Sequence, residues 1–119
     1  MPSALVLVVD DHPGFRRLAR RTLELSGFRV AEAVDGAEAL TEAARLRPDV
    51  VLLDIQLPDV DGFAVARSLA ETDCPAPVVL TSTREAADYG DRIGRSSAVA
   101  FLPKTALSGA ALRALLERR

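Results

Sequence analysis

The sequence predicts an α/β fold in which a parallel sheet is covered by helices on both faces. Short apolar runs alternate with amphipathic stretches along the whole chain, and this alternation is typical of strands joined by crossover helices. The runs are apolar almost without interruption, as expected for strands buried on both faces. Because 119 residues with 49% hydrophobic content are enough for one core, we expect a single domain.

Five segments are expected to form the strands of this sheet. The first is a continuous apolar run rich in β-branched residues, and three later runs resemble it. A weaker strand follows the first helical stretch. In chain order, the five predicted strands are residues 4–9, 28–34, 50–53, 78–81 and 99–102.

Helical spacing of apolar residues predicts the connections between these strands. In residues 13–25, Phe15, Ala19 and Leu23 fall on one face, and Gly27 is a stop signal. Residues 85–95 are expected to form only a short or mobile helix, because a glycine in a helix interior costs about 1 kcal/mol and this stretch holds two. The other predicted helices are 37–46, 63–71 and 107 to the end.

Composition excludes several classes of protein. A formal net charge of −2 argues against a general affinity for nucleic acid or anionic membranes. No apolar stretch reaches the roughly 18 residues of a membrane span, and the first residues lack a charged leader. We therefore expect a soluble, cytoplasmic protein. Cys74 is the one cysteine, so it cannot form an internal disulfide, and we expect it to fill a loop or the core.

Chemically active side chains follow four of the five predicted strands. Asp10 and Asp11 come after the first run, Asp54 after the third, Ser82 ends the fourth, and Lys104, the only lysine of the chain, follows the fifth. Ligands of open parallel sheets bind at the carboxyl ends of the strands. The sequence therefore predicts that these five residues meet at one edge of the sheet.

Three carboxylates gathered at one edge predict a divalent cation. They repel one another unless a cation is present, and Mg²⁺ prefers oxygen ligands of this kind. A carboxylate beside Mg²⁺ and a lysine suits phosphoryl transfer, in which the carboxylate can be the nucleophile. Asp54 is the best candidate for the nucleophile because it stands alone after the central run. The pair Asp10 and Asp11 is better suited to holding the metal.

Six motifs spread over nearly the whole chain resemble one known family. They are Val-Val-Asp-Asp-His at 8–12, Asp-Gly-Ala-Glu-Ala-Leu at 35–40, Pro-Asp-Val-Val-Leu-Leu-Asp at 48–54, Leu-Pro-Asp-Val-Asp-Gly at 57–62, Pro-Val-Val-Leu-Thr-Ser at 77–82 and Phe-Leu-Pro-Lys at 101–104. In these motifs the sequence resembles the receiver domains of bacterial two-component response regulators. The resemblance implies a flavodoxin-like, doubly wound sheet of order 2-1-3-4-5 with five helices. It also implies that residues 1–119 form one receiver domain without an output domain.

The resemblance further implies a phosphorelay function, with the chain acting as a signalling module rather than an enzyme. Asp54 would accept a phosphoryl group from a phosphohistidine of a sensor histidine kinase. Asp11, Asp54 and the backbone carbonyl of Gln56 would ligate Mg²⁺ directly, and Asp10 would act mainly through water. Ser82 and Lys104 would hold the phosphoryl oxygens.

A switch follows from the charge that phosphorylation adds. The Ser82 hydroxyl and the Lys104 ammonium would be drawn inward, and the family resemblance implies that Phe101 would turn into the space that Ser82 leaves. This would alter the face built from the fourth helix, the fifth strand and the fifth helix, which could bind an output domain or a second copy. Phe101 is equally compatible with a simple role in the core.

Four arginines of the first predicted helix, Arg16, Arg17, Arg20 and Arg21, have two interpretations. Charged residues on an amphipathic helix normally form its solvated face. Receiver domains, however, commonly dock this helix against the kinase, and charge would steer that association.

Two other functions remain open. Haloacid-dehalogenase-type phosphatases also combine an aspartate nucleophile, a hydroxyl, a lysine and Mg²⁺, but they usually carry Asp-x-Asp after the first strand, where this chain has Asp10-Asp11-His12. A pseudo-receiver that binds partners without phosphorylation is less favoured, because all five site positions are filled.

Overall fold

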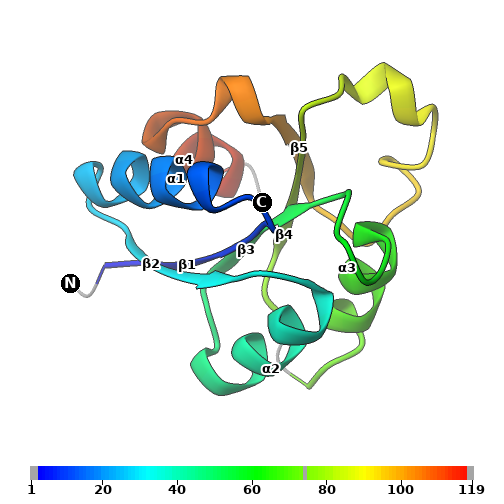
Figure 1. The fold of residues 1–119 in the computed structure, drawn as a ribbon, viewed down its shortest axis with the longest axis horizontal. Helices are drawn as coiled ribbons and strands as arrows, with labels where there is room; N and C mark the ends of the chain where they lie inside the picture. Colours follow the sequence, from blue (N-terminus) through cyan, green and yellow to red (C-terminus); the bar gives the residue numbers. More distant parts are fainter. Residues whose placement is uncertain (1–2, 74, 118–119) are drawn as a thin grey trace.

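The computed structural model describes residues 3–73 and 75–117, and the prediction for Cys74 lies outside these ranges. Five strands form one sheet in the order β2-β1-β3-β4-β5, and every neighbouring pair is parallel (Figure 1). This confirms the predicted fold class and strand order. The strands are β1 (Leu5–Val9), β2 (Arg29–Ala33), β3 (Val50–Asp54), β4 (Val78–Ser82) and β5 (Ala100–Pro103).

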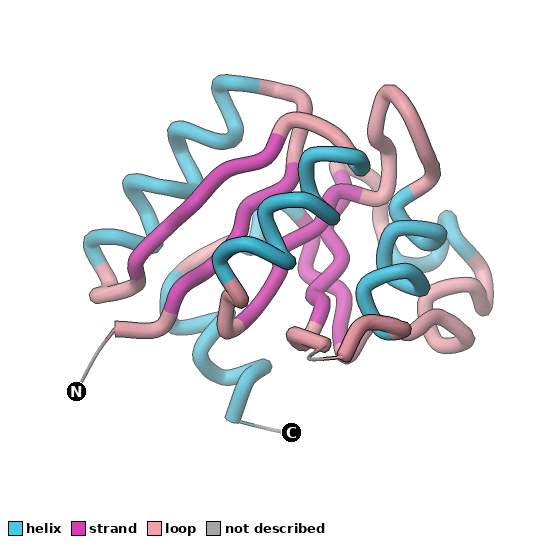
Figure 2. Tube along the Cα trace, turned by 90° about the horizontal axis from the view of Figure 1, so that it is seen from below, coloured by secondary structure: helices cyan, strands magenta, loops and turns pink. Residues whose placement is uncertain are grey.

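Helices cover both faces of this sheet, so that it forms the middle of three layers (Figures 1 and 2). Helices α1 and α4 lie on one face, and α2 and α3 lie on the other. Within the described ranges the α-helices are α1 (Pro13–Leu25), α2 (Gly36–Leu46), α3 (Gly62–Ala70) and α4 (Gly109–Glu117). Two short 3₁₀ helices are η1 (Ala86–Tyr89) and η2 (Lys104–Ala106).

The short helix predicted within residues 85–95 is present, but it is a 3₁₀ helix, so the described residues hold four α-helices and not the five helices expected. There the chain forms η1, of four residues, and then a series of turns. Gly90 ends η1 with a φ of +59°, a conformation that favours glycine and does not continue a right-handed helix. Gly90 thus ends the helical stretch after one turn, and α4 is the helix predicted from residue 107 onward.

Strand alternation divides the core into two clusters. Leu7 and Val9 of β1 pack in the cluster on the α2 and α3 side, whereas Val6 and Val8 pack in the cluster on the α1 and α4 side, because successive side chains of a strand point to opposite faces. All five residues of β3 are buried. The sheet is therefore well packed on both faces, and the polar residues predicted for the site stand at its carboxyl edge.

Local sequence explains where α2 begins. Asp35 is its N-cap, and the side chain accepts a hydrogen bond from the amide of Glu38 at 2.8 Å. Asp59 accepts from the amides of Gly36 and Ala37 at 2.9 and 3.0 Å, which also satisfies first-turn donors. In the described part of the chain, no helix has both the length and the apolar character that crossing a membrane requires.

Candidate functional site

The structure gathers the predicted site at the carboxyl edge of the sheet. Asp54 and Ser82 are the last residues of β3 and β4, Asp10 directly follows β1, and Lys104 directly follows β5. Because all strands are parallel, these ends lie on the same edge. Asp11 is beside Asp10 and stays exposed.

Lys104 lies between two buried carboxylates. Its ammonium nitrogen is 2.6 Å from Oδ2 of Asp10 and 3.2 Å from Oδ2 of Asp54. The side chains of Asp10 and Asp54 are 0% and 3% exposed, and that of Lys104 is 10% exposed. Two carboxylates therefore share one ammonium, which leaves an excess negative charge away from water.

Burial and ion pairing have opposite effects on the pKa values of Asp54 and Lys104. Burial raises the pKa of Asp54, although the backbone hydrogen bond from Gln56 and the charge of Lys104 work against the rise. Burial alone would lower the pKa of Lys104, but its contact with Asp10 and the charge of Asp54 outweigh burial and raise it. Lys104 therefore remains an ammonium at neutral pH and can neutralise an anion bound beside Asp54.

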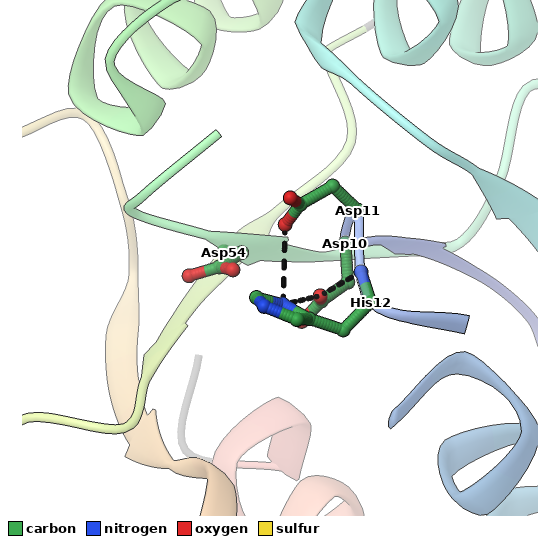
Figure 3. Close-up of side chains that lie close together, drawn as sticks. All are labelled: Asp10, Asp11, His12 and Asp54. Atoms are coloured by element: carbon green, nitrogen blue, oxygen red, sulfur yellow. Dashed lines mark hydrogen bonds and ion pairs between the residues drawn. The ribbon is translucent and has the colours of Figure 1, made fainter. Parts of the chain in front are cut away.

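The acidic residues have the chemistry of a site for a hard cation. Asp10, Asp11, His12 and Asp54 each offer a ligand atom, and these atoms all lie within 4.8 Å of one another (Figure 3). Oδ2 of Asp10 is buried and makes no directed hydrogen bond in the described chain; its partner is the Lys104 ammonium. Carboxylate oxygens grouped in this way fit Mg²⁺.

His12 contacts the carboxylates of both Asp10 and Asp11. Its Nδ1 is 3.1 Å from Oδ1 of Asp10 and 3.2 Å from Oδ1 of Asp11, and the side chain is 68% exposed (Figure 3). The amide of His12 also donates to Oδ1 of Asp10 at 2.9 Å. Imidazole is not a favoured ligand of Mg²⁺, and these contacts orient the Asp10 carboxylate instead.

The loop after β3 is packed tightly against Asp54. The amide of Gln56 donates to Oδ1 of Asp54 at 3.1 Å, which places the Gln56 backbone beside the carboxylate. A β-carbon at Gly62 would lie 2.5 Å from the carbonyl oxygen of Asp54. Glycine is thus required where α3 starts, because the backbone of residues 54–55 leaves no room for a side chain there.

Ser82 is fully buried and has a partner that the sequence did not reveal. Its Oγ accepts a hydrogen bond from the amide of Arg84 at 3.0 Å and shares one of 2.6 Å with the hydroxyl of Tyr89. Phe101 is partly buried on the α2 and α3 side, and its ring centroid is 6.3 Å from that of Tyr89. A lone aromatic residue among the polar residues of 83–92 was the one sequence signal for Tyr89.

The arginines of α1 divide into two pairs. Arg16 and Arg20 reach Glu32 of β2, with nitrogen–oxygen distances of 3.0 and 2.7 Å, and Arg16 also donates to the carbonyl of Asp10 at 2.8 Å. Arg17 and Arg21 are exposed. The first pair therefore ties α1 to the sheet, and Glu32 is a structural residue that sequence reasoning missed.

The sheet order and the edge site together define a flavodoxin-like α/β domain with an acidic pocket. The family model described as "Response regulator receiver domain" matches residues 6–117. The chain therefore belongs to the receiver domains of two-component response regulators, which are signalling domains rather than classical enzymes.

Similar proteins agree with this membership. The transcriptional regulatory protein PrrA of Mycobacterium tuberculosis is 43% identical over 98% of this chain, and the positive alginate biosynthesis regulatory protein of Pseudomonas aeruginosa is 43% identical over 83% of it. The chain covers 52% and 40% of their lengths, so it spans about half of these relatives.

Solved structures show the same fold. The receiver domain of the putative response regulator NarL from Mycobacterium tuberculosis is 35% identical and superposes with a TM-score of 0.83. The chemotaxis response regulator CheY4 of Vibrio cholerae is 28% identical, with a TM-score of 0.84. Each alignment covers 98% of both chains.

Proposed function

We propose that Asp54 is the phosphoacceptor of a two-component phosphorelay and that its donor is the phosphohistidine of a sensor histidine kinase. The observation that carries this proposal is the buried Asp54 carboxylate paired with the Lys104 ammonium at 3.2 Å, beside two further aspartates. Kinases are the partners of receiver domains, and the family membership supports the same donor.

The chain's own residues suit an in-line transfer. The Asp54 carboxylate attacks phosphorus while the phosphorus–nitrogen bond to the donor imidazole breaks; the imidazole keeps the electron pair and takes up a proton. The Gln56 amide holds the attacking carboxylate in position. Lys104 would bind the phosphoryl oxygens, over which negative charge is distributed in the transition state. Ser82 would bind them as well once its hydroxyl has moved inward.

The acidic residues would hold a magnesium ion. Direct ligands would be Asp11, Asp54 and the backbone carbonyl of Gln56, and Asp10 would act mainly through water. When bound, the ion would neutralise charge on the phosphoryl oxygens. The support is the group of carboxylate oxygens described above, including the buried Oδ2 of Asp10.

Phosphorylation of Asp54 would act as a switch. New negative charge at Asp54 would attract Ser82 and Lys104, and Phe101 would turn into the space that Ser82 leaves. This would change the face formed by residues 83–99, β5 and α4. The occupant of that face would be an output domain or a second copy of the chain.

Helix α1 would be the docking site of the kinase. Leu18 and Leu25 are 58% and 80% exposed on it, and the exposed Arg17 and Arg21 add charge that steers association. Arg16 and Arg20 would contribute less directly, since both are held by Glu32. A kinase partner places this function in the cytoplasm, and we assign no direct nucleic-acid binding to a chain with a net charge of −2.

Incubation with a small phosphodonor and Mg²⁺ tests this function. Wild-type protein should gain the mass of one phosphoryl group, and Asp54→Asn should gain none, because an amide cannot form the acyl phosphate. Asp91→Asn, which changes an exposed aspartate of residues 83–99, is the matched control and should be modified like wild type. Equal modification of Asp54→Asn would reject the assignment, and steady hydrolysis of a generic phosphomonoester would favour a phosphatase instead.

A further inference from the structure

Residues 83–99 join β4 to β5, and they stand out from the body of the domain as the yellow segment of Figure 1. We call them the fourth crossover. Their side chains are mostly exposed. Two of the described residues 83–99 pack against a core cluster: Tyr89, in the middle of the crossover, and Ala98, two residues before β5. Tyr89 is therefore the one large apolar side chain that attaches the middle of this stretch to the core.

Tyr89 lies between two aromatic residues and a buried hydroxyl. Its ring is 5.9 Å from that of Phe63 on α3, at an interplanar angle of 70°, and 6.3 Å from that of Phe101 on β5. Its hydroxyl is 2.6 Å from Oγ of Ser82. The same side chain thus touches the residue that would move on phosphorylation and the residue that would fill the space left behind.

The other side-chain attachment of the fourth crossover is weaker. Arg92 is 2.9 Å from Oδ2 of Asp61 and lies 4.3 Å from the centroid of the Phe63 ring. The side chains of Arg92 and Asp61 are 55% and 47% exposed, and ion pairs in solvent contribute little. The contacts of Asp88 with Glu85 and of Arg95 with Asp91 lie within the crossover itself.

The Ser82 hydroxyl makes its present hydrogen bonds with partners other than Asp54. In the described chain its Oγ accepts from the Arg84 amide and shares a hydrogen bond with the Tyr89 hydroxyl, in which either oxygen can be the donor. Binding a phosphoryl oxygen on Asp54 would require this hydroxyl to turn toward Asp54 and donate its proton there. The short contact with Tyr89 would then open.

We propose that Tyr89 is the tether of the fourth crossover and that phosphorylation releases it by withdrawing the Ser82 hydroxyl. The proposal rests on Asp54 being the phosphoacceptor. It adds Tyr89 to the residues of the switch. The Ser82 hydroxyl breaks its hydrogen bond with Tyr89, and Tyr89 loses its polar partner beside Phe101. The crossover then keeps apolar packing at Tyr89 and Ala98 and the exposed Arg92 contact. The surface offered to a partner then includes residues that were held against the core.

The chain provides its own probe, because Tyr89 is its only tyrosine and it has no tryptophan. Tyrosine fluorescence therefore reports on Tyr89 alone. Acrylamide should quench this fluorescence more strongly after phosphorylation of the wild type than before. In Ser82→Ala the quenching should be at the raised level without any phosphodonor, and in Asp54→Asn the donor should change nothing.

Tyr89→Phe separates the hydroxyl from the ring, since it retains the apolar packing. Trypsin should cut after Arg92 and Arg95 faster in unmodified Tyr89→Phe than in the wild type, because cleavage follows the population of the open segment. Val99→Ala, a change at an exposed residue of the same crossover, should leave the rate unchanged.

Each possible result decides between distinct claims. If mass analysis shows phosphorylated wild type but quenching is unchanged, the release is wrong and the phosphoacceptor stands. If phosphorylation raises quenching equally in the wild type and Ser82→Ala, the signal does not pass through Ser82 and the tether is wrong. If Tyr89→Phe is cut no faster than the wild type, the hydroxyl does not hold the crossover. A wild type that takes up no phosphoryl group overturns the proposed function and the release together.

Discussion

Two connections at the same edge of the sheet differ sharply in how they are held. The first crossover, residues 10–28, contains the 13 residues of α1 and contributes the fully buried Ala19 and Leu23 to the core. The fourth crossover has four residues of 3₁₀ helix and then turns. Arg16 and Arg20 bind the first crossover to Glu32, whereas the fourth is held by Tyr89, by Ala98 next to β5 and by an exposed ion pair.

This difference suggests separate roles for the two crossovers: the first keeps the acidic pocket in place, and the fourth can change its conformation. Asp10 and Asp11 begin the well-packed crossover, so we expect the acidic pocket to keep its shape if Asp54 is phosphorylated as proposed. Ser82 precedes the loosely attached crossover, and Phe101 and Lys104 follow it. A small movement at Ser82 can therefore change the surface over many residues, because little else holds that surface in place.

Truncating one apolar side chain in each crossover should give the largest contrast. Leu23→Ala should lower the free energy of unfolding by about 2–5 kcal/mol, the usual cost of emptying a closed core site, because Leu23 is 0% exposed. Ile93→Ala should cost less, roughly 1 kcal/mol, because the Ile93 side chain is only partly buried and packs against neither core cluster. Urea unfolding of both variants measures the difference. Comparable losses would show that the fourth crossover is as firmly packed as the first.

Magnesium should act on the beginning of the first crossover. If the acidic pocket binds the ion, magnesium at about a hundred times its Kd should stabilise the wild type by about 2.7 kcal/mol, seen as a higher Tm. Asp11→Asn should remove most of this gain while leaving the metal-free Tm nearly unchanged, because the Asp11 side chain is exposed. Arg95→Gln in the fourth crossover is the control and should keep the full gain. Full stabilisation of Asp11→Asn would place the ion elsewhere.

The smallest effect should come from the ion pairs of each crossover. The hydrogen bond from Arg20 lowers the pKa of Glu32, despite some burial. A lowered pKa in the folded state means that the pairing stabilises the fold above the ordinary pKa of glutamate and is lost as pH falls through the lowered value. Glu32→Gln should therefore be less stable than the wild type at neutral pH, by about 1 kcal/mol or less.

The stability difference between Glu32→Gln and the wild type should shrink as the solution is acidified below about pH 4. Asp91→Asn, whose pair with Arg95 is largely in solvent, should match the wild type throughout. Thermal unfolding from neutral to acidic pH checks both variants. A difference that grows on acidification would mean that Glu32 is not stabilised by its arginines.

Much of the sheet and of the site at its carboxyl edge could be predicted from the sequence, because each strand leaves a local pattern of apolar residues. Buried strands leave continuous apolar runs, and parallel strands place the residues after those runs on one edge. This brought Asp10, Asp54 and Lys104 together although they lie far apart in the chain. The six motifs added the strand order that the runs alone left open.

The contacts that depend on packing could not be predicted in the same way. The sequence placed Tyr89 within a predicted helix, and helical spacing alone does not say whether its side chain contacts Ser82. The structure instead has a short 3₁₀ helix that ends at Gly90. Glu32 lies in β2, and which arginines it meets depends on how α1 packs across the sheet. Charge at positions 16 and 20 indicated one helix face but not what that face would meet.

Amide hydrogen exchange before and after phosphorylation tests the contrast between the two crossovers most directly. Peptides from residues 83–99 should exchange faster once Asp54 carries a phosphoryl group, and peptides from residues 13–25 should keep the same rate, because only the fourth crossover depends on the Ser82 hydroxyl. Asp54→Asn treated with the same phosphodonor should show neither change. Equal acceleration in both crossovers, or no acceleration in residues 83–99 of fully phosphorylated protein, would contradict a phosphorylation switch built on this difference.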